Sequence, residues 1–241
     1  MAEISIVVPV LNEEESIKPF LQRTESVLDK IGKPYEIIFA LDPSTDNTKK
    51  IILDEIKRNK NIRLLIFSRQ FGQPAATMAG IFNCKGSFCV IIDADLQDPP
   101  EVIEELYKKI ILGNEVVYAK RKSRKGETFF KKIISSLGYY LIIKLSDIHI
   151  PKDAGDFRII SRKVIDQLKK LNESHGFLRG MVAFVGYSQS YVEYDRDERY
   201  AGKSKYNKFL GSLKIGLNGI IGFSSRPLFL MSVLGFTIAL L

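Results

Sequence analysis

Two aspartates, Asp93 and Asp95, are the residues with the clearest chemical meaning in this sequence. They follow the apolar run Phe88–Ile92 and precede Leu-Gln-Asp-Pro-Pro. Two carboxylates at the end of a buried strand lie at the carboxyl edge of a sheet, where open α/β sheets bind ligands. Because Mg²⁺ is typically held by one or two carboxylates and substrate phosphates, the pattern indicates a divalent cation between protein and diphosphate. The alternative is a solvated turn, since Asp is common where strands end.

Polar residues follow three further apolar runs in the same half of the chain. Residues 9–15 read Pro-Val-Leu-Asn-Glu-Glu-Glu, residues 41–48 read Leu-Asp-Pro-Ser-Thr-Asp-Asn-Thr, and residues 68–74 read Ser-Arg-Gln-Phe-Gly-Gln-Pro. In a parallel sheet all four loops face one crevice. Neither GxGxxG nor GxxxxGK[ST] occurs in this half, which disfavours a dinucleotide oxidoreductase and a P-loop phosphotransferase. The loops therefore predict a nucleotide held by side chains at its base and by a metal at its diphosphate.

The elements that must position these loops alternate between strand and helix over residues 1–118. Near-continuous apolar strands between helices indicate a mostly parallel sheet covered on both faces. The expected strands are Ile4–Val10, Tyr35–Leu41, Ile62–Phe67, Phe88–Ile92 and Glu115–Tyr118. The expected helices are Glu14–Ile31, Asp46–Asn59, Pro74–Phe82 and Pro99–Leu112.

Composition limits the partners and the compartment. Lys and Arg number 36 against 28 Asp and Glu, which gives a net charge of +8. A basic chain favours an anionic partner, either nucleic acid or a membrane surface with phosphorylated ligands. Cys84 and Cys89 are too few for a disulfide framework and lack metal-ligand spacing, which indicates buried thiols in a reducing compartment. The N-terminus lacks a signal-peptide apolar region, so we do not expect export.

The chain changes character after residue 120. Residues 128–146 are more apolar than a surface helix requires, and lysines flank their aromatic residues, which suits a helix in a membrane interface. An amphipathic helix packed on the sheet is the alternative, and residues 205–222 allow the same two interpretations. The basic tract Lys120–Lys125 then favours an anionic bilayer over nucleic acid.

The final residues, 228–241, carry no charge but fall short of the length of about 20 residues that a spanning helix needs. We expect them to begin a transmembrane helix. A buried C-terminal helix of a soluble protein is the alternative.

Taken together, the motifs resemble those of family 2 glycosyltransferases with the GT-A fold, and more narrowly those of the polyprenyl-phosphate glycosyltransferases. The segments that carry the resemblance are Val8–Glu13, Asp42–Asp46, Ser68–Gly72, Asp93–Pro100, Gly155–Arg158 and Arg199–Tyr206. The resemblance implies an α/β, Rossmann-like, mostly parallel sheet with helices on both faces. Juxtamembrane amphipathic helices and the start of a transmembrane helix would follow.

The resemblance also divides the chain into four parts. Residues 1–120 would be the nucleotide-sugar-binding half of the GT-A domain, and residues 121–204 the acceptor-binding half with its interfacial helix. Residues 205–227 would form a juxtamembrane helix and residues 228–241 a truncated transmembrane helix.

The resemblance assigns donor-site roles to individual residues. Pro9 and Asp42 would line the base pocket, with the Asp42 carboxylate accepting the uracil imide N–H, and Glu13 would approach the ribose. Asp93 would contact the ribose or metal region, and Asp95 would act in catalysis by coordinating Mg²⁺ or Mn²⁺. Gln97 would be a second metal contact, and Asp98 would touch the metal or the donor sugar. The further nucleotide-binding candidates are Leu11, Gln73 and Ala94.

The acceptor side requires cations. A lipid phosphate with a second pKa of about 6 is already nucleophilic near neutral pH, so positioning matters more than a strong base. The candidates for binding one or other phosphate are Arg121, Lys131, Arg199, Lys203 and Lys205. Asp156 lies where relatives place a carboxylate proposed as catalytic base, and orientation of a neighbouring cation is its competing role. Structural ion pairs are the simplest interpretation of Arg158 and Arg179.

The resemblance implies inverting, metal-dependent transfer of a hexose to undecaprenyl or dolichyl phosphate, with UDP-glucose as the first expectation for the donor. The catalytic domain would lie at the cytoplasmic face of the cell membrane, without a nucleic-acid partner, and a homo-oligomer is compatible with it. One alternative is a family 2 transferase with a polysaccharide or protein acceptor, which the absence of Trp disfavours. Another is a non-catalytic, membrane-tethered nucleotide-sugar sensor, which Leu41 and Pro43 leave open because family members often carry a polar residue and Gly there.

Overall fold

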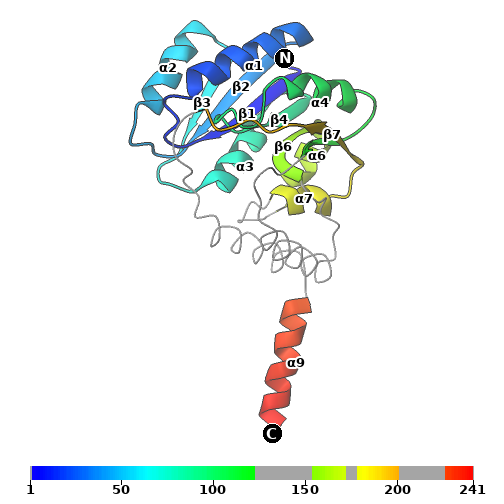
Figure 1. Cartoon of the computed structure of the whole chain (residues 1–241). Helices are drawn as coiled ribbons and strands as arrows, with labels where there is room; N and C mark the ends of the chain where they lie inside the picture. Colours follow the sequence, from blue (N-terminus) through cyan, green and yellow to red (C-terminus); the bar gives the residue numbers. More distant parts are fainter. Residues whose placement is uncertain (1, 123–153, 172–177, 201–225, 241) are drawn as a thin grey trace.

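The computed structural model of the protein describes residues 2–122, 154–171, 178–200 and 226–240 (Figure 1). Within these residues the chain forms a seven-stranded sheet with the order β3-β2-β1-β4-β6-β5-β7. The strands are β1 Ile4–Val10, β2 Tyr35–Leu41, β3 Ile62–Ile66, β4 Phe88–Ile91, β5 Val116–Arg121, β6 Ala154–Ser161 and β7 Gln189–Tyr194. The helices are α1 Ile17–Ile31, α2 Thr48–Arg58, α3 Gln73–Asn83, α4 Val102–Ile110, α6 Arg162–Leu168, α7 Leu178–Phe184 and α9 Arg226–Leu240.

The sheet is mostly parallel, as the sequence predicts. Strands β1 to β4 pair in parallel, and β5 pairs in parallel with β7. Only β6, among the described strands, runs the other way, between β4 and β5. Because β6 is antiparallel, its first residues lie at the edge where its neighbours end. The sequence reasoning placed no strand at β6 or β7, although both join the same sheet as the first half of the chain.

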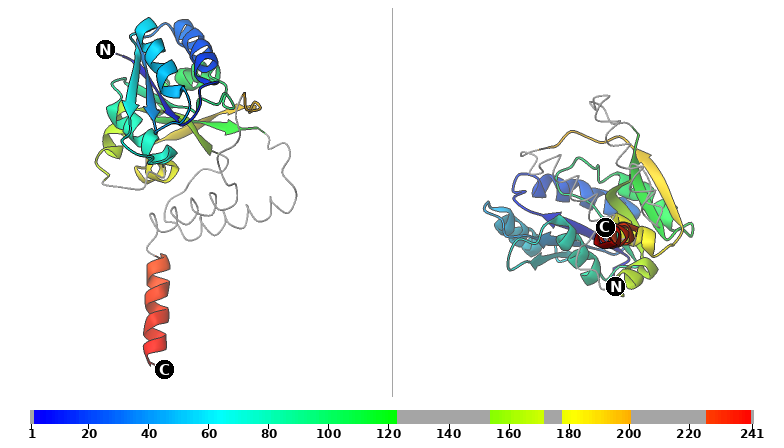
Figure 2. Two further views of the ribbon diagram at one scale, coloured as in Figure 1. Left: turned by 90° about the vertical axis from the view of Figure 1, so that its left-hand side faces the viewer. Right: turned by 90° about the horizontal axis from the view of Figure 1, so that it is seen from below.

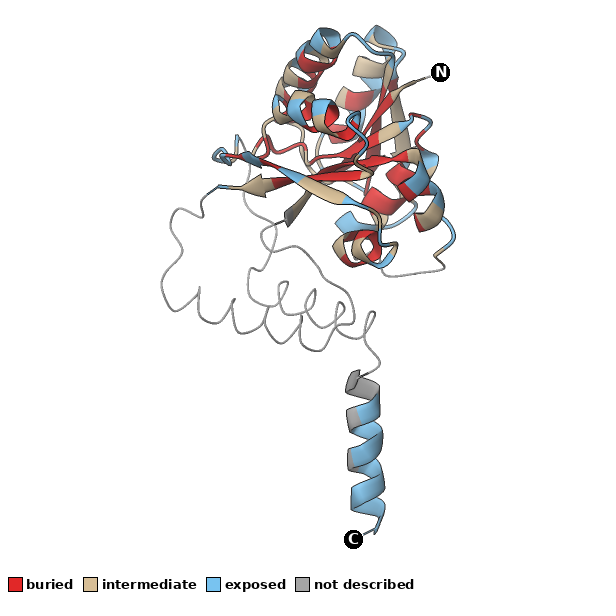
Figure 3. Cartoon of the chain, turned by 90° about the vertical axis from the view of Figure 1, so that its right-hand side faces the viewer, coloured by how far each residue is buried: buried red, intermediate tan, exposed pale blue. Residues whose placement is uncertain are grey.

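Two apolar cores lie on opposite faces of this sheet. Figures 1 and 2 show α1, α2 and α4 on one side of the sheet and α3, α6 and α7 on the other. Along β1 the side chains alternate between them: Ile6 and Val8 enter the core with Phe20 of α1, whereas Val7 enters the core with Met181 of α7. Burial on both faces explains why β1 and β2 are mostly apolar (Figure 3).

Helix α3 lies unusually close to the sheet. A Cβ atom added to Gly80 would overlap the side chain of Val7, so only glycine permits this approach. The helix begins at Gln73, directly after Gly72, whose φ of 88° belongs to the left-handed region that favours glycine, and Pro74 occupies the first turn. These local features place Gln73 at the carboxyl edge of the sheet.

The C-terminal residues form a helix, as expected. Phe229, Met231 and Phe236 on α9 are largely exposed (Figure 3). Of the helices that the structure describes, none combines the length and the apolar character needed to cross a membrane. Membrane insertion of residues 228–241 therefore stays a prediction. The expected interfacial helix at 128–146 and the juxtamembrane segment at 205–225 lie outside the described residues.

Candidate active site

The loops that follow β1 and β2 are bound to each other. The side chain of Asn12 accepts a hydrogen bond from the backbone N–H of Thr45 at 2.7 Å, and the N–H of Glu13 donates to the hydroxyl of Thr48 at 2.8 Å. Asn12 has a φ of 52°, a conformation that Asn tolerates better than most residues. Several polar residues of these loops are therefore structural, and they hold Glu13 in a defined position at the edge.

Asp42 joins the loop after β2 to the loop before α3. Its carboxylate accepts hydrogen bonds from the N–H groups of Phe71 at 3.1 Å and Gly72 at 2.8 Å, and the residue is 2% exposed. A carboxylate has about four acceptor positions, so these two bonds leave capacity for a third donor such as an imide N–H. Pro9 is buried within β1 opposite Ala40. Leu11 follows directly after the strand and is partly exposed.

Asp93 lies at the end of β4 and accepts a hydrogen bond from the Gln73 side-chain amide at 2.8 Å. Burial, and the negative charges of Asp95, Asp98 and Asp156, raise the pKa of Asp93 to about 8. Such crowding of carboxylates is unfavourable unless a cation compensates it. Ala94, between the two aspartates, is buried.

Asp95 and Glu13 share an arginine from a distant part of the chain. The Arg199 Nη2 atom lies 3.0 Å from Glu13 Oε1 and 3.6 Å from Asp95 Oδ2. The backbone N–H of Tyr200 also donates to the Asp95 carbonyl at 3.3 Å. The segment after β7 is therefore anchored on the Asp93–Asp95 loop, and its Arg199 guanidinium lies between Asp95 and Glu13 of the loop after β1.

Gln97 takes part in this arrangement through its backbone. Its N–H donates to Asp95 Oδ1 at 3.1 Å, and its carbonyl accepts from the N–H of Asp197 at 3.0 Å. These bonds fix the rotamer of Asp95 and attach the segment after β7.

The donor set fits a divalent cation that a substrate completes. No group of three or more His, Cys, Asp or Glu side chains in the described part of the chain could hold a metal ion. Mg²⁺ and Mn²⁺ sites of this kind use one or two carboxylates, and substrate phosphates supply further oxygen ligands. Asp95, beside Asp93, offers hard oxygen ligands, and a cationic group, the Arg199 guanidinium, lies 3.6 Å from Asp95 Oδ2.

Asp98 contacts a tyrosine and two arginines. It is buried and accepts a short hydrogen bond from the Tyr194 hydroxyl, while Arg196 Nε lies 3.3 Å and Arg121 Nη2 3.8 Å from Oδ1. Arg121 also donates to the Tyr194 hydroxyl at 3.3 Å. Asp98 therefore orients two arginines through Oδ1, and its expected contact with the metal or the donor sugar stays a prediction.

Asp156 lies near the start of β6, the strand Ala154–Ser161. The antiparallel register pairs Ile91, the last residue of β4, with Arg158, and the negative charge of Asp156 acts on Asp93. Arg179 of α7 binds Asp156 in a bidentate ion pair, with distances of 2.9 Å from Nε to Oδ1 and 3.5 Å from Nη2 to Oδ2. Burial raises the pKa of Asp156, but the charges and hydrogen bonds of Arg179, with Arg158 and Arg121, lower it below its ordinary value.

The structure thus brings Glu13, Asp93, Asp95, Gln73 and Arg199 to one edge, as predicted. The other phosphate-binding candidates, Lys131, Lys203 and Lys205, lie outside the described residues.

Arg196 and Tyr194 are not among the site residues that the sequence predicts. For Arg179 the sequence predicts only a structural ion pair. No local signal marks them, because each meets its partner across a long stretch of chain. The charged run Asp195–Arg199 was the one available cue for Arg196.

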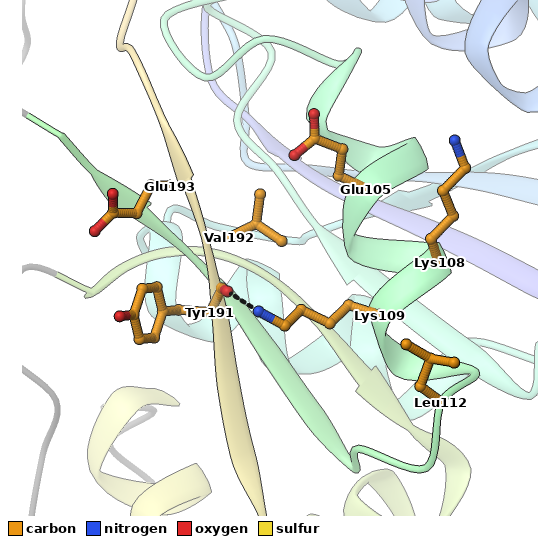
Figure 4. A pocket seen from close by; sticks show the side chains of 7 residues that line it. All are labelled: Glu105, Lys108, Lys109, Leu112, Tyr191, Val192 and Glu193. Atoms are coloured by element: carbon orange, nitrogen blue, oxygen red, sulfur yellow. Dashed lines mark hydrogen bonds between the residues drawn. The ribbon is translucent and has the colours of Figure 1, made fainter.

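A separate hollow lies between α4 and β7 (Figure 4). Both glutamates and lysines line it. The Lys109 ammonium donates a hydrogen bond to the backbone carbonyl of Tyr191 at 2.6 Å. Strand β7 is an edge strand of the sheet, and Lys109, from the neighbouring helix α4, binds one of its backbone carbonyls. The hollow is on the flank of the sheet rather than at the carboxylate edge, and we assign it no catalytic role.

Comparison with known proteins identifies the family of the chain. Residues 5–169 match the family model of glycosyl transferase family 2. The chain is 46% identical over 233 residues to the uncharacterized glycosyltransferase YkcC of Bacillus subtilis strain 168, an alignment that covers 97% of this chain and 72% of that protein. It is 38% identical over 239 residues to the bactoprenol glucosyl transferase of Shigella phage SfX, covering 98% and 77%.

Solved structures share the fold. Glucosyl-3-phosphoglycerate synthase from Mycobacterium tuberculosis, in complex with Mn²⁺, UDP-glucose and phosphoglyceric acid, superposes with a TM-score of 0.65 at 20% identity. The match covers 92% of this chain and 80% of that one. The GT-A type of α/β fold that the motifs imply is therefore confirmed for the sheet and its helices.

Proposed function

The chain belongs to glycosyl transferase family 2, and we propose that this enzyme transfers glucose from UDP-glucose to a polyprenyl phosphate with inversion at the anomeric carbon. The observation that carries the proposal is the meeting, at one sheet edge, of the carboxylates Asp93 and Asp95 with the arginines Arg199 and Arg179. Carboxylates suit a cation-bound diphosphate, and arginines suit a second, incoming phosphate.

Two observations support the donor half. Asp42 is held by backbone N–H groups in the loop before α3, in a position that suits recognition of a uracil imide. The structural relative with the same fold binds UDP-glucose together with Mn²⁺. A divalent ion at Asp95 would stabilise the nucleoside diphosphate as a leaving group. Glu13 and Gln73, both at the same edge, would orient the ribose and Asp93.

The acceptor half is supported by relatives that are similar over nearly the whole chain. Two of these, from Shigella phages SfX and SfV, are named bactoprenol glucosyl transferases and are each 38% identical to this chain. A phosphate dianion attacks directly, so the arginines need only hold it in line with the anomeric carbon. One displacement inverts that carbon. We place the reaction at the cytoplasmic face of the membrane, where the basic segments would meet anionic lipid.

A donor screen tests this proposal. Full-length protein in detergent, with Mg²⁺ and undecaprenyl phosphate, is incubated with UDP-glucose, UDP-N-acetylglucosamine, UDP-galactose or GDP-mannose, and lipid-linked sugar is detected by mass. We expect a glucosyl lipid from UDP-glucose. UDP release without a glycolipid would move the acceptor to another class. Nucleotide binding without turnover of any donor would favour a sensor.

A further inference from the structure

The ion pair between Asp156 and Arg179 joins two distant elements at the reaction edge. Arg179 comes from the first turn of α7, and Asp156 from the start of β6. Both side chains are partly exposed, at 34% for Arg179 and 40% for Asp156, and the charge of Asp156 acts on Asp93. A bidentate contact fixes the plane of the guanidinium, and a guanidinium carries five N–H donors in all.

Two more arginines reach the same two residues of β6. Arg158 Nη2 donates to the carbonyl of Gly155 at 2.7 Å, and a Cβ placed on Gly155 would lie 3.5 Å from Arg121 Nη2. Arg158 is 2% exposed, and its buried Nε has no hydrogen-bond partner among the described residues. Three guanidinium groups therefore gather at Gly155 and Asp156, and two carboxylates oppose them: Asp156, and Asp98 at 3.8 Å from Arg121.

This excess of positive charge lies directly beside the donor carboxylates. The carboxylates of Asp156 and Asp93 repel each other through space, and the charge of Asp156 helps to raise the pKa of Asp93. A phosphate that approached the donor sugar would thus meet arginines on one side and the donor-site carboxylates on the other. That arrangement attracts a dianion to one position only, next to the carbon it must attack.

We propose that Arg179 binds the acceptor phosphate, and that Asp156 is a positioning residue that holds the Arg179 guanidinium rather than the catalytic base. The inference rests on the proposed function, because it names the residue that receives its acceptor. A phosphate dianion carries no proton to be removed before attack, so a base at Asp156 has no proton to take. A carboxylate held by an arginine is also a poor general base near neutral pH, since the best bases titrate near the working pH.

The test uses four variants of the full chain: Arg179→Gln, Arg179→Lys, Asp156→Asn, and the double variant Asp156→Asn/Arg179→Gln. Arg58→Gln is the matched control, because Arg58 also pairs through Nε with a glutamate, Glu55, at 2.7 Å, but on the outer surface of α2. Kinetics with UDP-glucose and undecaprenyl phosphate separate the KM of each substrate from kcat. Binding of geranylgeranyl phosphate in detergent, with UDP and Mg²⁺ present, is measured separately.

We expect Arg179→Gln to raise the acceptor KM about tenfold or more, as the loss of one charged hydrogen-bonding group does, with the donor KM unchanged. Arg179→Lys should retain part of the affinity. In the Arg179→Gln background, Asp156→Asn should change kcat/KM by less than about threefold, because a positioning residue has nothing left to position.

Loss of a general base would instead cost about 10²- to 10⁴-fold in that same background, and that result would overturn the inference. Unchanged binding of geranylgeranyl phosphate by Arg179→Gln would overturn it as well. If the wild type forms no glycolipid, the proposed activity fails. Weaker geranylgeranyl phosphate binding by Arg179→Gln would even then support the assignment of Arg179.

Discussion

Arg199 occupies a central position in the candidate site. Its guanidinium lies between Glu13 and Asp95, in the region where a metal-bound diphosphate would sit. A divalent cation must therefore compete with the Arg199 guanidinium for the carboxylate of Asp95. Once UDP is bound, the same guanidinium can turn to the diphosphate, to which it is better matched than to a bare carboxylate pair.

This competition gives a prediction at the level of one residue. Arg199→Gln should bind Mn²⁺ more tightly than wild type in the absence of nucleotide, by several-fold, because a charge worth about 1 kcal/mol or more near these carboxylates is removed. The same variant should bind UDP with Mn²⁺ more weakly. Calorimetry measures both affinities, with Arg58→Gln as control. Equal Mn²⁺ affinity in the two proteins would show that Arg199 does not compete with the metal.

Much of the residue-level site could be predicted from the sequence. Asp93, Asp95 and Glu13 stand next to strands whose apolar runs are unmistakable, so their common edge follows from the parallel sheet. The bonds from Phe71 and Gly72 to Asp42, and the pair Arg179–Asp156, could not be predicted. Each depends on the path of a loop or helix from elsewhere in the chain. The sequence contains no spacing that encodes such contacts.

At the scale of elements, the local sequence pattern predicts the strands correctly where they are buried on both faces of the sheet. β1 and β2 begin and end at the predicted residues. Helix α1 begins at Ile17 rather than Glu14, because the Glu14 side chain instead accepts hydrogen bonds from Asn47. β6 was missed because charged Asp156 and Arg158 interrupt its apolar pattern, and its partners β4 and β5 lie far earlier in the chain.

The close packing of α3 on β1 gives a prediction for an element. Gly80→Ala should lower the free energy of unfolding by about 1–3 kcal/mol, because the added methyl group overlaps Val7. It should also weaken UDP binding, since α3 carries Gln73 to the donor edge. Urea unfolding and calorimetry measure the two effects. Gly235→Ala, where nothing lies within 4 Å of the added atom, is the control, and similar stability of both variants would argue against the close approach.

Glu36 joins three elements at the opposite end of the sheet. Its buried carboxylate accepts hydrogen bonds from Ser5 at 2.7 Å, the Lys85 N–H at 2.5 Å and Arg63 at 2.6 Å. Burial raises the pKa of Glu36, but the hydrogen bonds from Lys85, Ser5 and Arg63 outweigh it and lower the pKa below its ordinary value. The folded-state pKa lies below the unfolded value, so this stabilisation is present above the unfolded pKa of about 4.3 and is lost as the pH falls through the folded pKa.

Glu36→Gln should accordingly destabilise the protein by about 1–3 kcal/mol near neutral pH, because buried donors lose a charged acceptor. The difference from wild type should shrink as the pH falls below about 4. Denaturant unfolding across this range measures it. Glu104→Gln is the control, since Glu104 forms an exposed pair with Lys108 on one helix. A difference that stays constant with pH would contradict the role of the Glu36 charge.

At the scale of the whole molecule, one sheet carries the residues that we propose for both the donor and the acceptor chemistry. β4 provides Asp93, its antiparallel neighbour β6 provides Asp156, and the segment after β7 provides Arg199. Residues that are far apart in the sequence therefore reach one edge of a single sheet. The general architecture followed from alternating strands and helices, whereas the insertion of β6 between β4 and β5 did not.

The net charge of +8 gives a prediction for the whole chain. The protein should bind vesicles that contain phosphatidylglycerol more strongly than neutral phosphatidylcholine vesicles, at about 1 kcal/mol per basic residue near the surface. Added salt should reduce the difference, since screening shortens the range of these charges. Co-sedimentation measures both effects. Equal binding to the two kinds of vesicle at low salt would show that the positive charge of the protein does not attract it to the membrane.

The most direct test of the central claim compares the two products of one reaction. Wild-type protein and Asp95→Asn are incubated with UDP-glucose, Mg²⁺ and undecaprenyl phosphate, and UDP and glucosyl lipid are quantified together. Circular dichroism and Mn²⁺ binding establish that the variant is folded and has lost the metal ligand. We predict equimolar UDP and glucosyl lipid from wild type, in the anomeric configuration opposite to the donor, and neither from Asp95→Asn. Near-normal product formation by Asp95→Asn, or wild-type release of UDP without the lipid, would contradict the account.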